Sequence, residues 1–302
     1  MLGYPQRMQV GMNLPVMAPG LDRDTVRQWC RSVDEGPFSS IAAGERITFP
    51  NPEIMVTLSA AAAWTERVKI AFHVLVVPMH DPIWAAKQVA TLDVLSGGRV
   101  SLGVGVGARD EDYRAVGAVW DERLLSRMED GVSRMRQAWA GEMVVEGAAR
   151  PVEPAPLQAG GPEILAGVLM PKAIRRAAKW ADGISGFSFG PTSEDVAMRF
   201  DAAREAWREA GRERAPRLVT GFWYALGDNP KQQLGSYLER YLAFMGQGTG
   251  TALAPSVSAT SKQALRDALL MVRDLGADEV MLVPTSTDPN EVDRAAEIVG
   301  SL

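Results

Sequence analysis

The chain has 302 residues, of which 46% are hydrophobic and 23% charged, and its formal net charge is −5 at pH 7. These values are ordinary for a soluble globular enzyme, and they give no reason to expect a nucleic acid or an anionic membrane as a partner. The single cysteine, Cys30, cannot form an internal disulfide, and its helical surroundings favour a small buried hydrophobe over a nucleophile.

The sequence predicts neither a leader peptide nor a membrane span. The most apolar run, residues 70–79, has the length of a strand and is far too short to cross a bilayer. The first ten residues hold no apolar core of signal-peptide length. We therefore expect a cytoplasmic protein.

Strand and helix patterns alternate along the chain, which favours a parallel sheet with crossover helices. The predicted strands are 8–13, 38–42, 68–77, 100–106, 164–167, 183–187, 218–225 and 279–283. The predicted helices are 22–33, one capped by Asn51 with Pro52 in its first turn, 82–95, 109–116, 121–140, 171–181 and one capped by Thr192. Eight such strands predict an α/β fold, a single-domain (β/α)8 TIM barrel whose active site lies at the carboxyl ends of the strands.

Two segments interrupt this alternation. We expect one domain over residues 1–302, with an excursion at about 141–162 and a small, polar, glycine-rich loop at 246–261. The loop is either a mobile lid over the site or a plain surface loop.

The segment 78–117 is the most informative part of the chain. Asp81 can cap a helix that begins at Pro82, and Ser96-Gly97-Gly98 ends it. One face of this helix carries four apolar residues at helical spacing, namely Ile83, Ala86, Ala90 and Val94. The following strand is apolar except for Ser101, Gly103 and Gly105, as in a strand covered on both faces.

The glycines of this strand also form a loose G-x-G-x-x-A motif that ends at Ala108. A Rossmann nucleotide site requires a helix that opens inside the motif, after the first strand of the sheet. Here the strand is the fourth and Arg109-Asp110-Glu111-Asp112 follows it. We therefore favour glycines that let a flat ring or a phosphate approach a barrel strand.

Two passages carry a family resemblance. AKQVATLDVLSGGRVSLGVGVG at residues 86–107 resembles the bacterial-luciferase-like family of flavin- and F420-dependent oxidoreductases, and EVMLVPTSTDPNEVDRAAEIV at residues 279–299 is similar to that family's last strand and helix. The resemblance implies the luciferase-like barrel, reduced FMN or F420 as cofactor, a small organic substrate and a homodimer. The alanine-rich helix at 54–64 could pack against the second subunit, or against its own barrel.

The resemblance also implies a cofactor site. His73-Val74 matches the place of a non-prolyl cis peptide that presses on the flavin ring, although His73 can also be a satisfied core histidine. His80 is expected to orient the turn before the next helix. The residues expected at the cofactor are Asn13, His73, Val74, Gly105, Val106, Gly107, Ala166, Gly167, Val168, Leu169 and Met170.

The turn after the fifth strand is the expected phosphate site, because free N–H groups gather at a helix N-terminus. The family usually has a Gly-Gly and Ser-containing turn here, whereas this chain keeps Gly167 and continues with Val168, Leu169 and Met170. Luciferase carries an arginine at the position matching Val106. Both departures weaken phosphate binding, and a purely hydrophobic turn is the alternative.

Glu45 and Arg46 are the candidate catalytic residues. They follow the second strand, where F420-using relatives often carry Ser-Asp-His. Glu45 is the nearby carboxylate that could move protons, and Arg46 could bind an anionic substrate or stabilise a reduced, anionic flavin. The family's sugar-phosphate dehydrogenases carry a glutamate where this chain has Ala108, which argues against their reaction.

Aromatic residues at the ends of the sixth and seventh strands predict a substrate wall, although core packing explains them equally well. The expected substrate-binding residues are Phe187, Trp223 and Tyr224, with Phe189 beside them. The polar helix 109–116 either rims the mouth of the site or is a solvated face. Two histidines without a nearby carboxylate cluster predict no metal site.

The resulting prediction is a luciferase-like monooxygenase that uses reduced FMN from a separate flavin reductase, and O₂, on a small organic substrate. One alternative is an F420-dependent hydride-transfer reductase or dehydrogenase. Another is a flavin-binding protein without turnover. An aldolase-type lyase is disfavoured because its lysine, Lys69, would open the third strand at the wrong end of the barrel.

Overall fold

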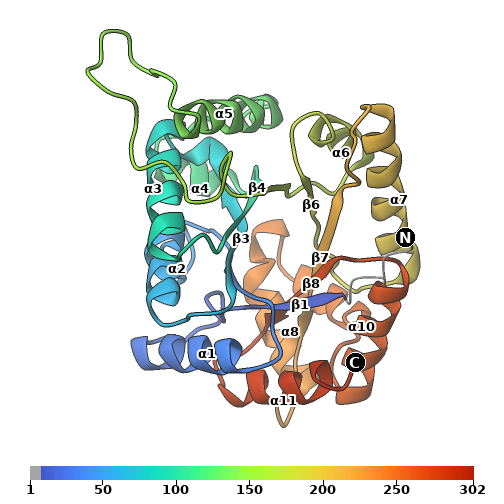
Figure 1. The fold of residues 1–302 in the computed structure, drawn as a ribbon. Helices are drawn as coiled ribbons and strands as arrows, with labels where there is room; N and C mark the ends of the chain where they lie inside the picture. Colours follow the sequence, from blue (N-terminus) through green and yellow to red (C-terminus); the bar gives the residue numbers. More distant parts are fainter. Residues whose placement is uncertain (1–7) are drawn as a thin grey trace, which may run out of the picture.

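The computed structural model describes residues 8–302, which form a closed barrel of eight parallel strands surrounded by helices (Figure 1). The strands pair in chain order, and β8 closes the barrel on β1. They are β1 (Gln9–Asn13), β2 (Ser40–Ala43), β3 (Lys69–Val76), β4 (Val100–Gly105), β5 (Ile164–Ala166), β6 (Gly183–Ser185), β7 (Arg217–Tyr224) and β8 (Glu279–Pro284). The predicted (β/α)8 barrel is confirmed.

The α-helices lie outside the barrel (Figure 1), and short 3₁₀ turns join some of the elements. The α-helices are α1 (Arg23–Glu35), α2 (Ile54–Ala63), α3 (Pro82–Leu95), α4 (Asp110–Ala115), α5 (Leu124–Trp139), α6 (Pro171–Ala177), α7 (Ser193–Glu209), α8 (Pro230–Tyr241), α9 (Thr249–Leu253), α10 (Lys262–Asp274) and α11 (Asn290–Val299). The 3₁₀ turns are η1 (Val77–Met79), η2 (Ala243–Met245) and η3 (Ala254–Ser256).

Side-chain caps begin several of these helices as the sequence predicts. Asp81 caps α3 by accepting from two backbone N–H groups, and Thr192 caps α7. The predicted cap of α2 is wrong. Its first turn is capped by Glu53, whose carboxylate accepts from the N–H of Val56, because the side-chain amide of Asn51 instead donates to carbonyls of the preceding loop.

The predicted buried face of α3 is only partly correct. Ala86 and Ala90 are buried, but Val94 is 36% exposed. The buried stripe also takes in Ala85 and Val89, because α3 packs against both the barrel and α5. On α1, Cys30 is buried as predicted, and burial raises the pKa of its thiol to about 12, so it is unreactive at neutral pH.

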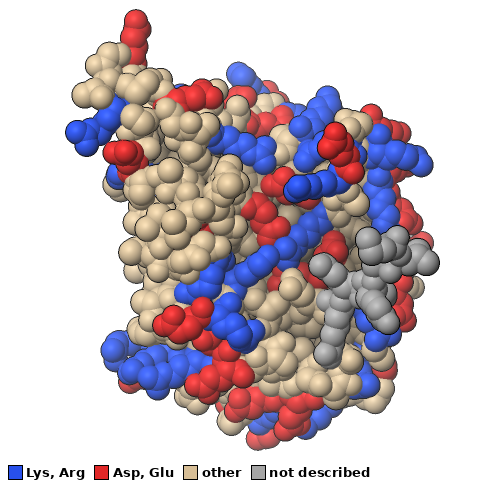
Figure 2. All heavy atoms as spheres, in the orientation of Figure 1, with Lys and Arg blue, Asp and Glu red and all other residues tan. Residues whose placement is uncertain are grey.

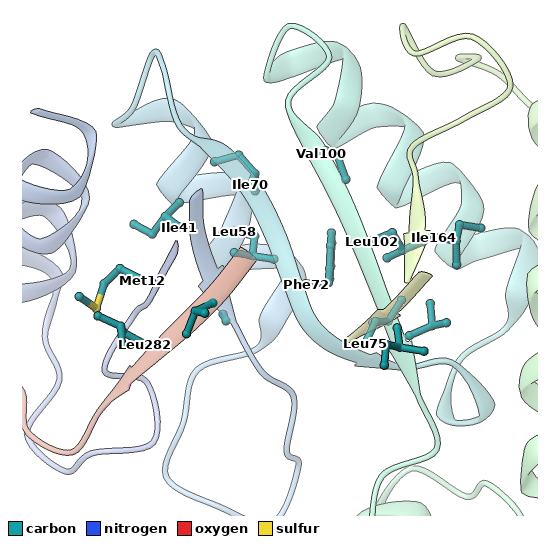
Figure 3. Close-up of a cluster of buried hydrophobic side chains, with 14 of the residues drawn as sticks. Met12, Ile41, Leu58, Ile70, Phe72, Leu75, Val100, Leu102, Ile164 and Leu282 are labelled. Carbon is teal, nitrogen blue, oxygen red and sulfur yellow. The ribbon is translucent and has the colours of Figure 1, made fainter. Parts of the chain in front are cut away.

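Alternate residues of each strand face opposite sides of the barrel wall. The outward residues, among them Met12, Ile70 and Leu102, pack against Leu58 and other helix residues in one large core (Figure 3). The inward residues of the barrel centre form a separate small cluster, which consists of Ala42, Ala71, Leu165, Val219 and Met281. This alternation decides which strand residues reach the site.

Charged side chains close the amino-terminal end of the barrel. Arg217 forms ion pairs with both Glu163 and Glu279, and Ser40 donates to Glu279 at 2.6 Å. Burial alone would raise the pKa of Glu163, but Arg217 and Lys69 hold it below its usual value. This network fills the lower end of the barrel, so the open end is the one at the carboxyl ends of the strands.

Two connections differ from short loops. The segment 141–162 holds no helix or strand and projects from the barrel at the upper left of Figure 1. The segment 246–261 is not featureless, since it contains α9 and η3. The reason is Glu239 on α8, whose carboxylate accepts from the backbone N–H groups of Gly248 and Thr251. Whether this segment moves stays a prediction.

The face formed by α2 and α3 carries few charged side chains (left side of Figure 2). Val56, Trp84 and Leu95 are exposed there by 71%, 59% and 75%. Of the alanines of α2, Ala61 and Ala62 pack inward against the barrel. Within residues 8–302, no helix combines the length and the apolar character that a membrane crossing requires.

Candidate active site

A cavity of about 290 Å³ opens at the carboxyl ends of the strands. Its walls are mostly apolar, and among the described residues only Glu45 and Arg109 contribute formal charge to the lining. The lining residues named for the site from sequence are Asn13, Glu45, His73, Val74, Gly105, Val106, Gly107, Gly167, Leu169, Phe187 and Trp223. The structure thus brings most of the predicted site residues together.

The peptide bond between His73 and Val74 is cis, as the resemblance implies. Val74 lies over glycines on β4 and just after β5. A β-carbon built at Gly105 would stand 2.7 Å from a methyl carbon of Val74, and one at Gly103 or Gly167 would stand 3.1 Å from the other methyl. Gly105 therefore makes room for Val74, whereas Gly103 admits the carbonyl oxygen of Phe72, from which its β-carbon would stand 2.3 Å. Close packing between β3 and β4 thus explains the glycine-rich strand.

His73 lies inside the barrel and borders the cavity. Its Nδ1 is 3.1 Å from the side-chain amide nitrogen of Asn13, and a hydrogen bond donated by that amide requires the tautomer in which Nδ1 carries no proton. Gly221 allows the ring to pack on β7, since a β-carbon there would be 2.8 Å from His73 Cε1. Burial lowers the pKa of His73 to about 4, so the ring is neutral at pH 7.

Glu45 borders the cavity, but its carboxylate already has partners. One oxygen accepts from the backbone N–H of Val76 at 2.7 Å, and the other is 2.8 Å from Nε2 of His80. Burial alone would lower the pKa of His80, but the hydrogen bond and charge of Glu45 raise it above its usual value. Glu45 and His80 are therefore a coupled pair that leads from the cavity toward the surface.

Five predicted site residues do not line the cavity. Arg46 lies behind the wall, where its guanidinium stacks on Phe49 at 3.8 Å. Ala166 and Val168 are buried in the core outside the barrel. Met170 is 68% exposed. The fifth residue is Tyr224.

Tyr224 fails to reach the cavity because successive strand residues face opposite sides. Its neighbour Trp223 points inward, whereas the Tyr224 hydroxyl lies in the barrel–helix core, 3.3 Å from the carbonyl of Glu291. The same alternation turns Ala166 away from the cavity and leaves Gly167 facing it.

The expected phosphate turn offers fewer free donors than the sequence predicts. The N–H of Gly167 donates to the carbonyl of Val104 at 2.6 Å, and that of Val168 donates to Ala166 at 3.0 Å. No side chain caps α6. The turn is therefore a largely hydrophobic strand–helix connection.

An aromatic wall closes one side of the cavity. Trp223 contacts Phe187 at a ring-centroid distance of 4.7 Å and Tyr241 at 5.5 Å, and Tyr237 stacks on Tyr241 at 5.6 Å. The two tyrosines come from α8, a helix that is not among those predicted from the sequence. The helical spacing of Leu234, Tyr237, Leu238 and Tyr241 after Pro230 is the signal that could have predicted this helix.

The sequence profile of the family described as luciferase-like monooxygenase matches residues 8–301. Among curated proteins, an uncharacterised protein of Mycobacterium tuberculosis is 33% identical over 171 residues, which is 54% of this chain and 59% of that protein. A second uncharacterised protein of the same organism is 29% identical over 178 residues, 55% of this chain and 58% of that protein. The matches thus span less than two thirds of these relatives.

Solved structures share the fold. A monooxygenase from Streptomyces bottropensis is 20% identical with a TM-score of 0.78, covering 97% of this chain and 98% of the other. An F420-dependent secondary alcohol dehydrogenase in complex with an F420–acetone adduct is 16% identical with a TM-score of 0.79, covering 98% and 99%.

A third structure is the oxygenating constituent of 3,6-diketocamphane monooxygenase of Pseudomonas putida in complex with FMN. It is 17% identical with a TM-score of 0.73, covering 97% of this chain and 96% of that one. At these identities the similarity concerns the fold. The family profile covers almost the whole chain, and the closed barrel agrees with it. The chain belongs to the luciferase-like monooxygenase family.

Proposed function

We propose that this chain is a monooxygenase that binds reduced FMN in the cavity and oxidises a small, largely apolar organic substrate with O₂. The observation that carries the proposal is the floor of the cavity. There Val74 lies over bare glycine backbone, at Gly105 on β4 and at Gly167 just after β5. Such a surface suits a flat ring, because the glycines carry no side chain beside the valine.

The described residues fit a bound isoalloxazine. Val74 would support one face of the ring system, and the segments Gly105–Gly107 and Gly167–Leu169 would flank it. When bound, reduced FMN supplies the electrons that activate O₂. The chain's part is to hold the ring and substrate together and to exclude water, which the aromatic wall of Phe187, Trp223 and Tyr241 favours.

The proton-bearing groups favour oxygen chemistry over hydride transfer. Reduction of a carbonyl or oxidation of an alcohol by hydride transfer needs a group that gives or takes a proton at the substrate. His73 is neutral and its Nδ1 is engaged by Asn13, while both oxygens of Glu45 have partners. Among the described lining residues, the one carboxylate, Glu45, is therefore already hydrogen-bonded on both oxygens, and the one histidine, His73, is neutral.

Oxygen uptake tests this proposal. Purified protein is supplied with FMN and a separate flavin reductase, and O₂ consumption is followed with a panel of small ketones, aldehydes and aromatic compounds. Uptake that depends on a substrate and yields an oxygenated product supports the monooxygenase. Oxidation of reduced F420, or reduction of F420, that depends on a substrate and leaves O₂ unchanged contradicts it.

The second candidate is an F420-dependent hydride-transfer enzyme, and one observation favours it. Glu45 borders the cavity and is joined to His80, so the pair could carry a proton between a substrate and the surface. If this second candidate is correct, Glu45→Gln should abolish substrate-dependent turnover of F420, because the substitution removes the carboxylate that carries the proton. Binding of either cofactor without turnover would indicate a flavin-binding protein.

A further inference from the structure

Two buried arginines lie together at the edge of the cavity. Arg109 follows β4 and borders the cavity, and Arg46 follows β2 and lies behind it. Their exposed fractions are only 8% and 6%. Burial and the charge of Arg109 lower the pKa of Arg46 to about 10, which still leaves it charged at pH 7.

The hydrogen-bonding capacity of this pair is almost unused. A guanidinium carries five N–H donors, and buried donors are nearly always paired. Within residues 8–302, Arg109 donates no hydrogen bond, and Arg46 donates one, to the carbonyl of Tyr241 at 3.4 Å. The Nε of each arginine is buried without a partner.

The neighbouring carboxylates do not use these donors. The closest oxygens are those of Asp112, 3.9 Å from Arg109, and Glu111, 3.9 Å from Arg46. Asp112 is held by Ile47 and Thr48, whose N–H and hydroxyl groups donate to its other oxygen. It balances charge in the region but does not satisfy the guanidinium N–H groups.

Aromatic rings hold the two guanidiniums in place. The Arg109 guanidinium carbon is 4.2 Å from the ring centroid of Phe244 and 5.3 Å from that of Tyr241. Stacking fixes the plane of a guanidinium and leaves the N–H groups along its edge free to bind. The rings also line the cavity, so an apolar body could lie against them while an anionic group meets the arginines.

We infer that Arg109, supported by Arg46, forms an oxyanion-binding subsite at the edge of the cavity, for a carboxylate or phosphate group of a bound molecule. The group could belong to an amphiphilic substrate with an apolar body and a carboxylate head, or to the phosphate tail of the cofactor. Because the turn after β5 is hydrophobic, the cationic end of the cavity is the one formed by this subsite. The substrate assignment rests on the proposed function, whereas the anion subsite itself does not.

The first test uses anions alone. Inorganic phosphate and benzoate are titrated at constant ionic strength while the Tm is measured, because a ligand that binds the native state raises the Tm. We expect both anions to raise the Tm of the wild type saturably, and Arg109→Met to weaken their binding about ten- to a hundredfold. Arg114→Met is the matched control, since Arg114 lies on α4 with its side chain 73% exposed, and it should respond like the wild type.

The second test identifies the source of the anion. If the cofactor phosphate occupies the subsite, Arg109→Met should weaken FMN binding and leave riboflavin binding unchanged. If a substrate carboxylate occupies it, the substitution should weaken benzoate binding and leave both flavins unchanged. Arg109→Lys, which keeps the charge but loses the forked donor geometry, should bind with intermediate affinity.

The inference is overturned if neither anion raises the Tm of the wild type, or if both bind Arg109→Met as tightly as the wild type. Arg109 would then serve only to hold Phe244. The wild-type titration decides the matter even if the substituted protein does not fold. It is also independent of the cofactor, so failure of FMN to bind would count against the proposed function and not against the subsite.

Discussion

Gly105 on β4 and Val74 on β3 share one space: a β-carbon at Gly105 would stand 2.7 Å from Cγ2 of Val74. Valine is stiff about its first side-chain torsion, so it cannot easily turn aside. The glycine is therefore required by the residue that follows the cis bond, and both lie at the floor of the cavity.

We predict that Gly105→Ala displaces Val74, weakens binding of the flat cofactor and destabilises the fold by about 1–3 kcal/mol through overpacking. Cofactor titration and urea unfolding measure the two effects. Gly235→Ala on α8 is the control, because nothing lies within 4 Å of its added β-carbon, and it should be neutral or slightly stabilising. Adding Val74→Ala to Gly105→Ala should recover stability; if it does not, the two residues do not compete for space.

The pKa values of the two histidines should lie on opposite sides of the ordinary histidine value. Burial lowers the pKa of His73 to about 4, whereas hydrogen bonding to Glu45 outweighs burial and raises the pKa of His80 above 6.5. The chain has only these two histidines, so an NMR titration of ¹⁵N-labelled histidine gives two ring systems to follow. His80→Gln assigns them. A ring assigned to His73 that became protonated near neutral pH would contradict the neutral, buried imidazole.

The Glu45–His80 pair should make stability depend on pH. The folded pKa of His80 lies above its unfolded value, so the pair's contribution is fully present below pH 6.5 and is lost as the pH rises through the folded pKa. Urea unfolding should show a larger difference in the free energy of unfolding between the wild type and His80→Gln below pH 6.5 than above the folded pKa of His80. A difference in the free energy of unfolding that grows with pH would contradict a raised pKa of His80 in the folded protein.

Arg217 should be essential for stability at the closed end of the barrel. Its removal leaves Glu279, whose side chain is 3% exposed, without its cation. We expect Arg217→Met to destabilise the protein by about 3 kcal/mol, as removal of one partner of a buried pair does. Adding Glu279→Gln should restore part of this loss. Equal stability of the single and double variants would contradict this, because Glu279 would then not be an uncompensated charge in Arg217→Met.

The apolar face of α2 and α3 leads us to propose a homodimer. Trp84→Asp on this face should shift the mass measured by light scattering from dimer to monomer, because it places a charge within the buried contact. Met198→Asp on α7, where the methionine is 50% exposed, is the control and should leave the mass unchanged. A monomeric wild type would remove the proposal.

The fold could be predicted from sequence because its signals are local. Strand-length apolar runs alternate with capped helices, and the residues that cap α3 and α7 are those predicted from the sequence. The site could be predicted only in part, because a side chain's direction depends on register. A one-residue difference decides that Trp223 lines the cavity and Tyr224 does not.

Tertiary contacts were the other part that sequence could not supply. Arg109 looks like the start of a solvated helix, but its guanidinium is buried under Phe244, a residue far along the chain. Glu45 looks like a free base, but its oxygens are taken by Val76 and His80. Such pairings follow from the closure of the barrel and not from spacing along the sequence.

Equilibrium binding of FMN, reduced FMN and F420 to the purified protein, followed by fluorescence, tests the central claim most directly. The account predicts that FMN binds, that it binds more tightly when reduced, and that Gly105→Ala weakens this binding. Binding of F420 without binding of FMN would contradict the monooxygenase and leave hydride transfer. Binding of none of the three would contradict a cofactor site above Val74.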